Sequence, residues 1–118
     1  PKRLDAALVV SDGPDTVACG MFTKNVFCAA PVQVDRDLLA HHMPRAVLLN
    51  SGNANAATGE PGLAIARKAA QATAHALGLP EGEALVASTG VIGVDLPWTP
   101  FETGYPRPRR GAVAGRRP

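Results

Sequence analysis

The sequence has few aromatic residues, only two cysteines and no long hydrophobic run, and each shortage excludes a class of protein. Aromatic residues make up 4% of the 118 residues although hydrophobic residues reach 46%, so the core is expected to be packed from alanine, valine and leucine. No apolar stretch approaches the roughly 18 residues that span a bilayer, and the N-terminal apolar run is too short for a signal peptide. We therefore expect a single cytoplasmic domain without a membrane anchor.

The cysteines and histidines have ordinary structural explanations. Cys19 and Cys28 are too few and too irregularly spaced for a disulfide framework, and no CxxC or HxxxH pattern suggests a metal site. We expect both to be reduced thiols packed as small hydrophobic side chains, with no bound metal. His41 and His42 are expected to cap the end of a short helix, and His75 to be a partly exposed residue of a longer one.

Positive charge is concentrated at the C-terminal end of the sequence. Residues 1–104 hold seven Lys or Arg and ten Asp or Glu, whereas residues 105–118 hold five arginines and no acid. This last segment is rich in Arg, Pro and Gly, so we expect it to be a disordered tail. It lacks the interleaved aromatic residues of a nucleic-acid-binding motif, and neither nucleic acid nor a membrane is an expected partner.

The hydrophobic pattern predicts an α/β fold, with a mixed sheet and a long alanine-rich helix packed on one face. The expected strands are short apolar runs bounded by turn residues, at 5–11, 17–22, 30–35, 45–50 and 84–88. The first two are expected to form a hairpin, and a short helix capped by Asp35 to run to His42. The long helix is expected over residues 58–77, with Thr58 at its start and Gly78 just past its end.

Two loops contain residue types that packing alone does not readily explain. Residues 50–59 hold three asparagines, a serine, a threonine and two glycines between a strand and the long helix. They form either an elaborate helix start or a polar ligand shelf beside a helix N-terminus, whose free N–H groups attract carboxylates. In residues 88–93, the hydroxyl of Thr89 directly precedes Gly90. This pair makes either a simple glycine turn or the side-chain donor and open backbone N–H of an oxyanion hole.

Three stretches of the chain resemble a known family: DAALVVSDGPDTVACGMFTKNVFCAAPV, RAVLLNSGNANAATGEPGL and ALVASTGVIGVDLP. The family is the bifunctional glutamate N-acetyltransferase/ornithine acetyltransferase of arginine biosynthesis, and the resemblance runs from about Leu4 to Pro97. It implies an α-β-β-α-like layered fold and transfer of an acetyl group from N-acetylornithine to glutamate. It also implies a precursor that cleaves itself into α and β chains, which assemble as α2β2.

The resemblance also implies which groups carry the reaction. The nucleophile is the new N-terminal threonine of the β chain, with its own α-amine as general base. No metal or tightly held cofactor is implied, although some relatives accept acetyl-coenzyme A. The family's oxyanion-hole pair falls on Thr89 and Gly90 of this sequence, while no asparagine of residues 50–58 receives an assigned contact.

The resemblance covers only part of the family's α chain, which we place in residues 1–104. The nucleophile has no counterpart here, and the composition changes abruptly at residues 105–118, as a shifted reading frame or a gene remnant would produce. We therefore expect this chain alone to be inactive. The alternative is a non-enzymatic remnant or binding module that combines the α-chain scaffold with a basic tail.

Overall fold

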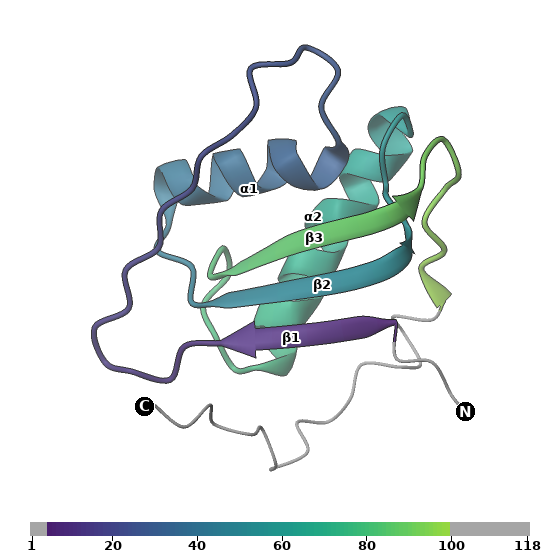
Figure 1. The fold of residues 1–118 in the computed structure, drawn as a ribbon. Coiled ribbons are helices and arrows are strands. Elements are labelled where there is room, and N and C mark those ends of the chain that lie inside the picture. The colour runs from purple at the N-terminus through teal and green to yellow at the C-terminus, as the bar shows by residue number, and fades with distance from the viewer. Residues whose placement is uncertain (1–4, 100–118) are drawn as a thin grey trace, which may run out of the picture.

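A computed structural model describes residues 5–99, which form a three-stranded sheet and two helices (Figure 1). In chain order these are β1 (Ala6–Val10), α1 (Ala30–His41), β2 (Ala46–Asn53), α2 (Gly59–Ala76) and β3 (Ala84–Val91). The central strand β2 is antiparallel to β1 and parallel to β3, so the sheet is mixed, as the sequence predicts. The predicted tail at residues 105–118 lies outside the described residues.

The helix α2 connects the two parallel strands and packs on one face of the sheet (Figure 1). A parallel pair requires such a crossover, and alanine side chains let the helix axis come close to the strands. The buried core consists mainly of small residues from both helices and the two parallel strands: Ala30, Val34, Ala46, Leu48, Ala66, Ala69, Ala70, Ala74, Ala84 and Val86. None of the helices in residues 5–99 is both long and apolar enough to cross a membrane.

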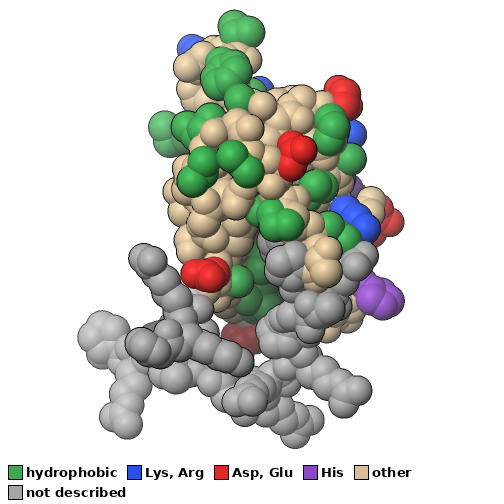
Figure 2. Space-filling view, turned by 90° about the vertical axis from the view of Figure 1, so that its right-hand side faces the viewer, with side chains coloured by type: hydrophobic (Ala, Val, Ile, Leu, Met, Phe, Trp, Pro, Cys, Tyr) green, Lys and Arg blue, Asp and Glu red, His purple; other side chains and the backbone are tan. Residues whose placement is uncertain are grey.

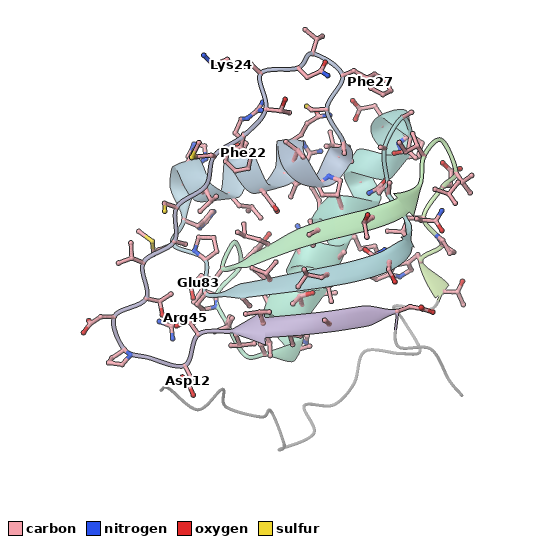
Figure 3. All side chains as sticks on the ribbon, viewed as in Figure 1. Asp12, Phe22, Lys24, Phe27, Arg45 and Glu83 are labelled. Carbon is pink, nitrogen blue, oxygen red and sulfur yellow. The ribbon has the colours of Figure 1, made fainter. Side chains whose placement is uncertain are left out.

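The other face of the sheet carries no helix in the described part of the chain. Val9 is 60% exposed there and Leu49 38% exposed, although both belong to strands. Residues 5–99 therefore provide one sheet and one helical layer of the layered fold that the resemblance implies. At the amino ends of β2 and β3, Arg45 and Glu83 form an ion pair at 3.6 Å (Figure 3).

Two of the predicted strands are wrong. Residues 17–22 form no strand in the structure, and the partner of β1 is β2 instead. Residues 30–35 are the first half of α1, which has Pro31 in its first turn, where the fixed φ of proline favours helix formation. The residues of α1 that pack on the core are Ala30, Val34 and Leu38, four apart, so the helical period and not the strand period decides this segment.

The ends of the helices differ in part from the prediction. The helix α2 has nearly the predicted bounds, and Gly78 follows it with a φ of +68°, as expected for a glycine that ends a helix. Thr58 occupies the N-cap position but makes no capping bond, and Asp35 lies inside α1 and caps nothing. His41 lies in the last turn of α1, where its Nδ1 is 2.9 Å from the carbonyl oxygen of Asp37.

The two cysteines are free thiols, as predicted, but their packing differs from the expectation. Cys28 is half-buried, whereas Cys19 is exposed and does not contribute to the core. Its exposure follows from the missing strand pairing of residues 17–22, since a side chain of an unpaired segment has no second layer to pack against.

The carboxylate of Asp35 occupies the free edge of the sheet. The helix α1 lies beside β3, and Oδ1 of Asp35 accepts a hydrogen bond of 3.0 Å from the Val86 N–H. This contact pairs a backbone donor of an edge strand, which would otherwise be open to another chain. Burial raises the pKa of Asp35 from 3.8 to about 6, an effect that outweighs the opposing effect of the bond from Val86.

We expect Asp35 to make the fold less stable as the pH rises. Because its pKa in the folded chain lies above 3.8, its contribution to stability is fully present below about pH 4 and is lost as the pH rises through about 6. Asp35→Asn keeps the acceptor for Val86 without the charge. The difference in melting temperature, variant minus parent, should therefore increase from about pH 4 to about pH 8. Thermal unfolding monitored by circular dichroism measures it. A difference that stays constant over this range would contradict the prediction.

Candidate functional site

The two polar segments singled out in the sequence meet at the carboxyl ends of the parallel strands. Both are partly strand and not only loop, because β2 extends to Asn53 and β3 to Val91. In the parallel register Ser51 is paired with Thr89 and Gly52 with Gly90. Each strand thus ends in a hydroxyl residue followed by glycine, and the two hydroxyl–glycine pairs lie side by side.

The paired glycines allow the two backbones to approach closely. Gly52 has a φ of +110° and Gly90 a φ of +130°, a region that residues with a side chain rarely adopt. A Cβ added to Gly90 would overlap the carbonyl group of Gly52. Glycine at position 90 is therefore required by its neighbour on β2 as well as by its own conformation.

The hydroxyl of Thr89 is open to solvent at this end of the sheet. Thr89 is exposed, and within residues 5–99 its side chain has no hydrogen-bond partner. The alternation of β3 places it on the opposite face from the buried Val86, which faces the helices. A donor that is held on a strand and not already paired is available to a ligand.

Apolar side chains are exposed just after Gly90. Figure 2 looks onto this end of the sheet and shows hydrophobic and uncharged groups with separate acidic side chains among them. Three apolar residues after the glycine are exposed, Val91 by 58%, Ile92 by 65% and Val94 by 51%, and the exposed Asp95 follows them.

The asparagines of the first segment hold the two strand ends together. Asn50 Oδ1 accepts a hydrogen bond of 2.6 Å from the Ser88 hydroxyl, one position before the hydroxyl–glycine pairs. Asn53 Nδ2 donates to the carbonyl oxygens of Val94 and Asp95 at 3.2 and 3.3 Å. These bonds join segments about forty residues apart in sequence, and they fix the position of the β3 end relative to β2.

Asn55 anchors the start of both helices. It is fully buried, its Nδ2 donates to the Gly62 carbonyl at 3.0 Å, and its Oδ1 accepts from the Thr58 hydroxyl at 2.8 Å. Its own carbonyl accepts the Ala30 N–H at 3.2 Å. All three asparagines therefore have partners within the chain, which favours a structural role for residues 50–59 over a shelf of free ligand-binding groups.

A cavity of about 400 Å³ lies near the starts of the two helices. Its walls come from residues 26–28, from Ala30 and Gln33 of α1, and from residues 57–60 and Leu63. Thr89 and Gly90 are not among these residues. Within residues 5–99, no three side chains of His, Cys, Asp or Glu come together as a metal site would require.

Sequence reasoning singled out Thr89 and Gly90 as candidates but gave no role to Gly52. The signal was available, because NSG at residues 50–52 and STG at residues 88–90 both follow apolar runs that end a strand. Only the register shows that the two glycines face each other.

Curated proteins similar to this chain come from several bacteria. The arginine biosynthesis bifunctional protein ArgJ of Geobacter sulfurreducens is 47% identical over 106 residues, which cover 90% of this chain and 27% of that protein. The protein of the same name from Bifidobacterium longum is 50% identical over 95 residues, 80% of this chain and 24% of that protein. The chain thus spans about a quarter of the length of these relatives.

Two solved structures share the fold. Ornithine acetyltransferase from Mycobacterium tuberculosis, crystallised in complex with ornithine, aligns with a TM-score of 0.80 at 44% identity, over 85% of this chain and 54% of that chain. The arginine biosynthesis bifunctional protein ArgJ from Bacillus halodurans aligns with a TM-score of 0.80 at 36% identity, over 87% and 54% of the two chains.

The family assignment extends further along the chain than the three stretches that suggested it. The ArgJ family profile matches residues 1–113, past Pro97 and into the arginine-rich segment. Since this match covers nearly the whole sequence, and the relatives and solved structures agree with it, the chain that carries the paired hydroxyl–glycine strand ends belongs to the ArgJ family.

Proposed function

We propose that this chain is the α-chain portion of a glutamate N-acetyltransferase, which transfers an acetyl group from N-acetylornithine to glutamate. The observation that carries the proposal is the Thr89–Gly90 pair, an unpaired hydroxyl next to a glycine at an open strand end, in a chain of the ArgJ family. The ornithine in the Mycobacterium tuberculosis relative supports an ornithine-type substrate. Acetyl-coenzyme A is a further acetyl donor to test, and no metal or tightly held cofactor is required.

In the proposed reaction, Thr89 and Gly90 act on the oxyanion. The N-terminal threonine of a β chain attacks the acetyl carbonyl of N-acetylornithine, and its α-amine takes the hydroxyl proton. The carbonyl oxygen becomes negatively charged, and the Thr89 hydroxyl and the Gly90 N–H donate hydrogen bonds to it. Collapse releases ornithine with the proton and leaves an acetyl-threonine ester. The amine of glutamate then attacks this ester, and the threonine is regenerated.

The proposal requires a partner that supplies the nucleophile. No residue of this chain is assigned that role, so the partner is the β chain of the same precursor, in an α2β2 assembly in the cytoplasm. On its own, the chain provides the electrostatic half of the site and is expected to give no turnover.

We expect a hybrid protein to show the activity. In this hybrid the chain replaces the matching quarter of the Geobacter sulfurreducens relative. Purified hybrid should form N-acetylglutamate from N-acetylornithine and glutamate, while the isolated 118-residue chain should not, as measured by mass spectrometry of the products. The unaltered relative is the positive control.

Two results would contradict the proposal. A hybrid that folds and cleaves itself into two chains but transfers no acetyl group would favour a non-enzymatic remnant. Turnover by the isolated chain would show that the nucleophile lies within it.

A further inference from the structure

The face of the sheet that carries no helix, the helix-free face, changes from apolar to polar at one end. Residues paired across neighbouring strands have their side chains on the same face. Two apolar rows cross the three strands on the helix-free face, Val9–Val47–Leu85 and Ala7–Leu49–Ala87. The next row is Asp5–Ser51–Thr89. Thr89 therefore belongs to a row of three polar residues at the edge of an apolar surface.

The backbone places Asp5 in this row. Its carbonyl oxygen accepts a hydrogen bond of 2.8 Å from the Ser51 N–H, which continues the antiparallel pairing of β1 and β2 by one residue. Because β1 is antiparallel to β2, its start lies beside the carboxyl ends of β2 and β3 (Figure 1). An acidic residue is thus brought to the strand ends that carry the two hydroxyl–glycine pairs.

The three side chains of the row are open to solvent. Asp5, Ser51 and Thr89 are all exposed, and none of their side chains has a hydrogen-bond partner within residues 5–99. Neighbouring strands lie about 4.8 Å apart, so Ser51 is one strand spacing and Asp5 two strand spacings from Thr89. The row therefore presents two hydroxyl groups and then a carboxylate to a group that approaches this face.

The proposed acetyl transfer creates two opposite charges in one step. An oxyanion forms on the acetyl group, and an ammonium forms when the α-amine of the β-chain threonine takes the proton of its own hydroxyl. The amine must lie within about 2.6–3.2 Å of that hydroxyl oxygen. Since this oxygen becomes bonded to the carbon that bears the oxyanion, the ammonium forms roughly 3–5 Å from the oxyanion, which is about one strand spacing.

With the oxyanion beside Thr89, acceptors for the ammonium lie in one direction across the sheet. β3 is an edge strand of the described sheet, so the face continues from Thr89 only onto β2. Two residues away along β3, in either direction, are the apolar Ala87 and Val91. Ser51 is the next residue across the sheet and accepts hydrogen bonds through its hydroxyl oxygen, and Asp5 follows with a carboxylate.

We propose that Ser51 and Asp5 hold the α-amine of the nucleophilic threonine and so position the general base of the reaction. Ser51 Oγ accepts a hydrogen bond from the amine, and the Asp5 carboxylate stabilises the ammonium once the amine has taken the hydroxyl proton. When the intermediate collapses, this proton passes to the departing nitrogen of ornithine, and the amine is neutral again. The inference rests on the proposed acetyl transfer and adds two residues to its site.

The pKa of the threonine α-amine tests the proposal directly. In the self-cleaved hybrid labelled with nitrogen-15 threonine, the NMR shift of this amine against pH gives its pKa, which is ordinarily about 8. A nearby carboxylate favours the charged form of an amine, so Asp5→Asn should lower this pKa by roughly 0.5–1. The measurement requires no turnover, so its result is independent of whether the hybrid transfers acetyl groups.

Kinetics of the hybrid should show the same change. The amine acts as a base only when it is neutral, so kcat/KM falls at low pH with the pKa of the amine. Asp5→Asn should move this fall to lower pH by the same amount. Ser51→Ala should move it in the same direction by less and lower kcat about 10-fold, whereas Ser51→Thr keeps the hydroxyl and should restore most of kcat. Thr89→Ala should lower kcat without moving the fall.

Asp95→Asn is the matched control for the loss of a carboxylate. Asp95 is exposed at the same end of the sheet, where its carbonyl oxygen lies 3.3 Å from Asn53 Nδ2, but it is not part of the row. The other nearby acid, Glu60, belongs to the first turn of α2, on the opposite face of the sheet. Because charges in solvent are screened over about 10 Å, Asp95→Asn should change the pKa of the amine by roughly 0.2 or less.

Other outcomes would overturn the proposal. An unchanged amine pKa in Asp5→Asn, or an equal change in Asp95→Asn, would show that Asp5 does not lie beside the amine. A higher KM for N-acetylornithine at an unchanged amine pKa would assign the carboxylate to the ammonium of the substrate. A lower kcat in Ser51→Ala with no effect on the pH dependence would make Ser51 a donor to the oxyanion. A hybrid without acetyl transfer whose amine pKa falls in Asp5→Asn would contradict only the proposed function.

Discussion

Replacement of Thr89 by alanine in the hybrid protein is expected to lower kcat by about 10²–10³-fold, with little change in KM. Removing one oxyanion-hole donor typically has an effect of this size. The Thr89 hydroxyl is exposed at the open end of β3 and has no partner in residues 5–99, so its loss leaves no buried group unsatisfied. The effect should therefore fall on the transition state and not on the stability of the fold. Steady-state kinetics with N-acetylornithine and glutamate measure both constants.

Two matched variants show whether the hydroxyl itself is responsible. Thr89→Ser keeps the donor and should retain most of kcat. Ser11→Ala removes a hydroxyl just beyond the end of β1. Because β1 is antiparallel to β2, this end of β1 lies beside the amino end of β2, away from the site, and kcat should be unchanged. A change confined to KM in Thr89→Ala would give Thr89 a role in substrate binding, contrary to its role at the oxyanion.

The elements that sequence reasoning located well are those whose signals are local. The helix α2 is long and is followed by a glycine with positive φ, and its stripe of alanines has helical spacing. The first halves of β2 and β3 are apolar runs, which fit strands buried against helices, whereas their polar ends extend three residues beyond the predicted strands. Local periodicity and end signals suffice in these cases, since the same residues decide both the element and its burial.

The errors concern segments whose structure depends on residues far away. Residues 30–35 carry both alternating and helical patterns, and the contacts of Val34 with the core are what favour the helix. Residues 17–22 have the apolar pattern of a strand, but a strand is completed by its partner, and no strand pairs with them among the described residues. Sequence patterns predict faces; they do not predict which strands pair.

In the candidate site, too, local features could be predicted from the sequence and long-range pairing could not. The residue types at Thr89 and Gly90 indicated a possible donor pair from sequence, and the resemblance assigned them the oxyanion. The pairing of Gly52 with Gly90 depends on a parallel register set by the whole of α2, which connects β2 to β3. Such long-range register is not encoded in either motif alone, which is why Gly52 was missed.

Asn55→Ala is expected to destabilise the isolated chain by roughly 2–4 kcal/mol. Alanine removes the donor to the buried Gly62 carbonyl and the acceptor for the Thr58 hydroxyl, and leaving buried polar groups unpaired costs about 1–3 kcal/mol. The φ of +49° at this position adds a smaller cost, because asparagine tolerates a left-handed conformation better than alanine does. Urea unfolding followed by circular dichroism measures the difference.

The backbone and side-chain contributions of Asn55 can be separated within the same loop. Ala57 also has a positive φ, +58°, but it is exposed and its side chain makes no hydrogen bond. Ala57→Gly therefore changes only the free energy of the backbone conformation and should be neutral or stabilising. Asn55→Gly relieves the same strain but still lacks both side-chain bonds, and should therefore remain well below the parent in stability. If Asn55→Gly were as stable as the parent, the side-chain bonds would contribute nothing. The buried asparagine would then be required only for its backbone conformation, and the anchoring of the start of α2 by its side-chain amide would be wrong.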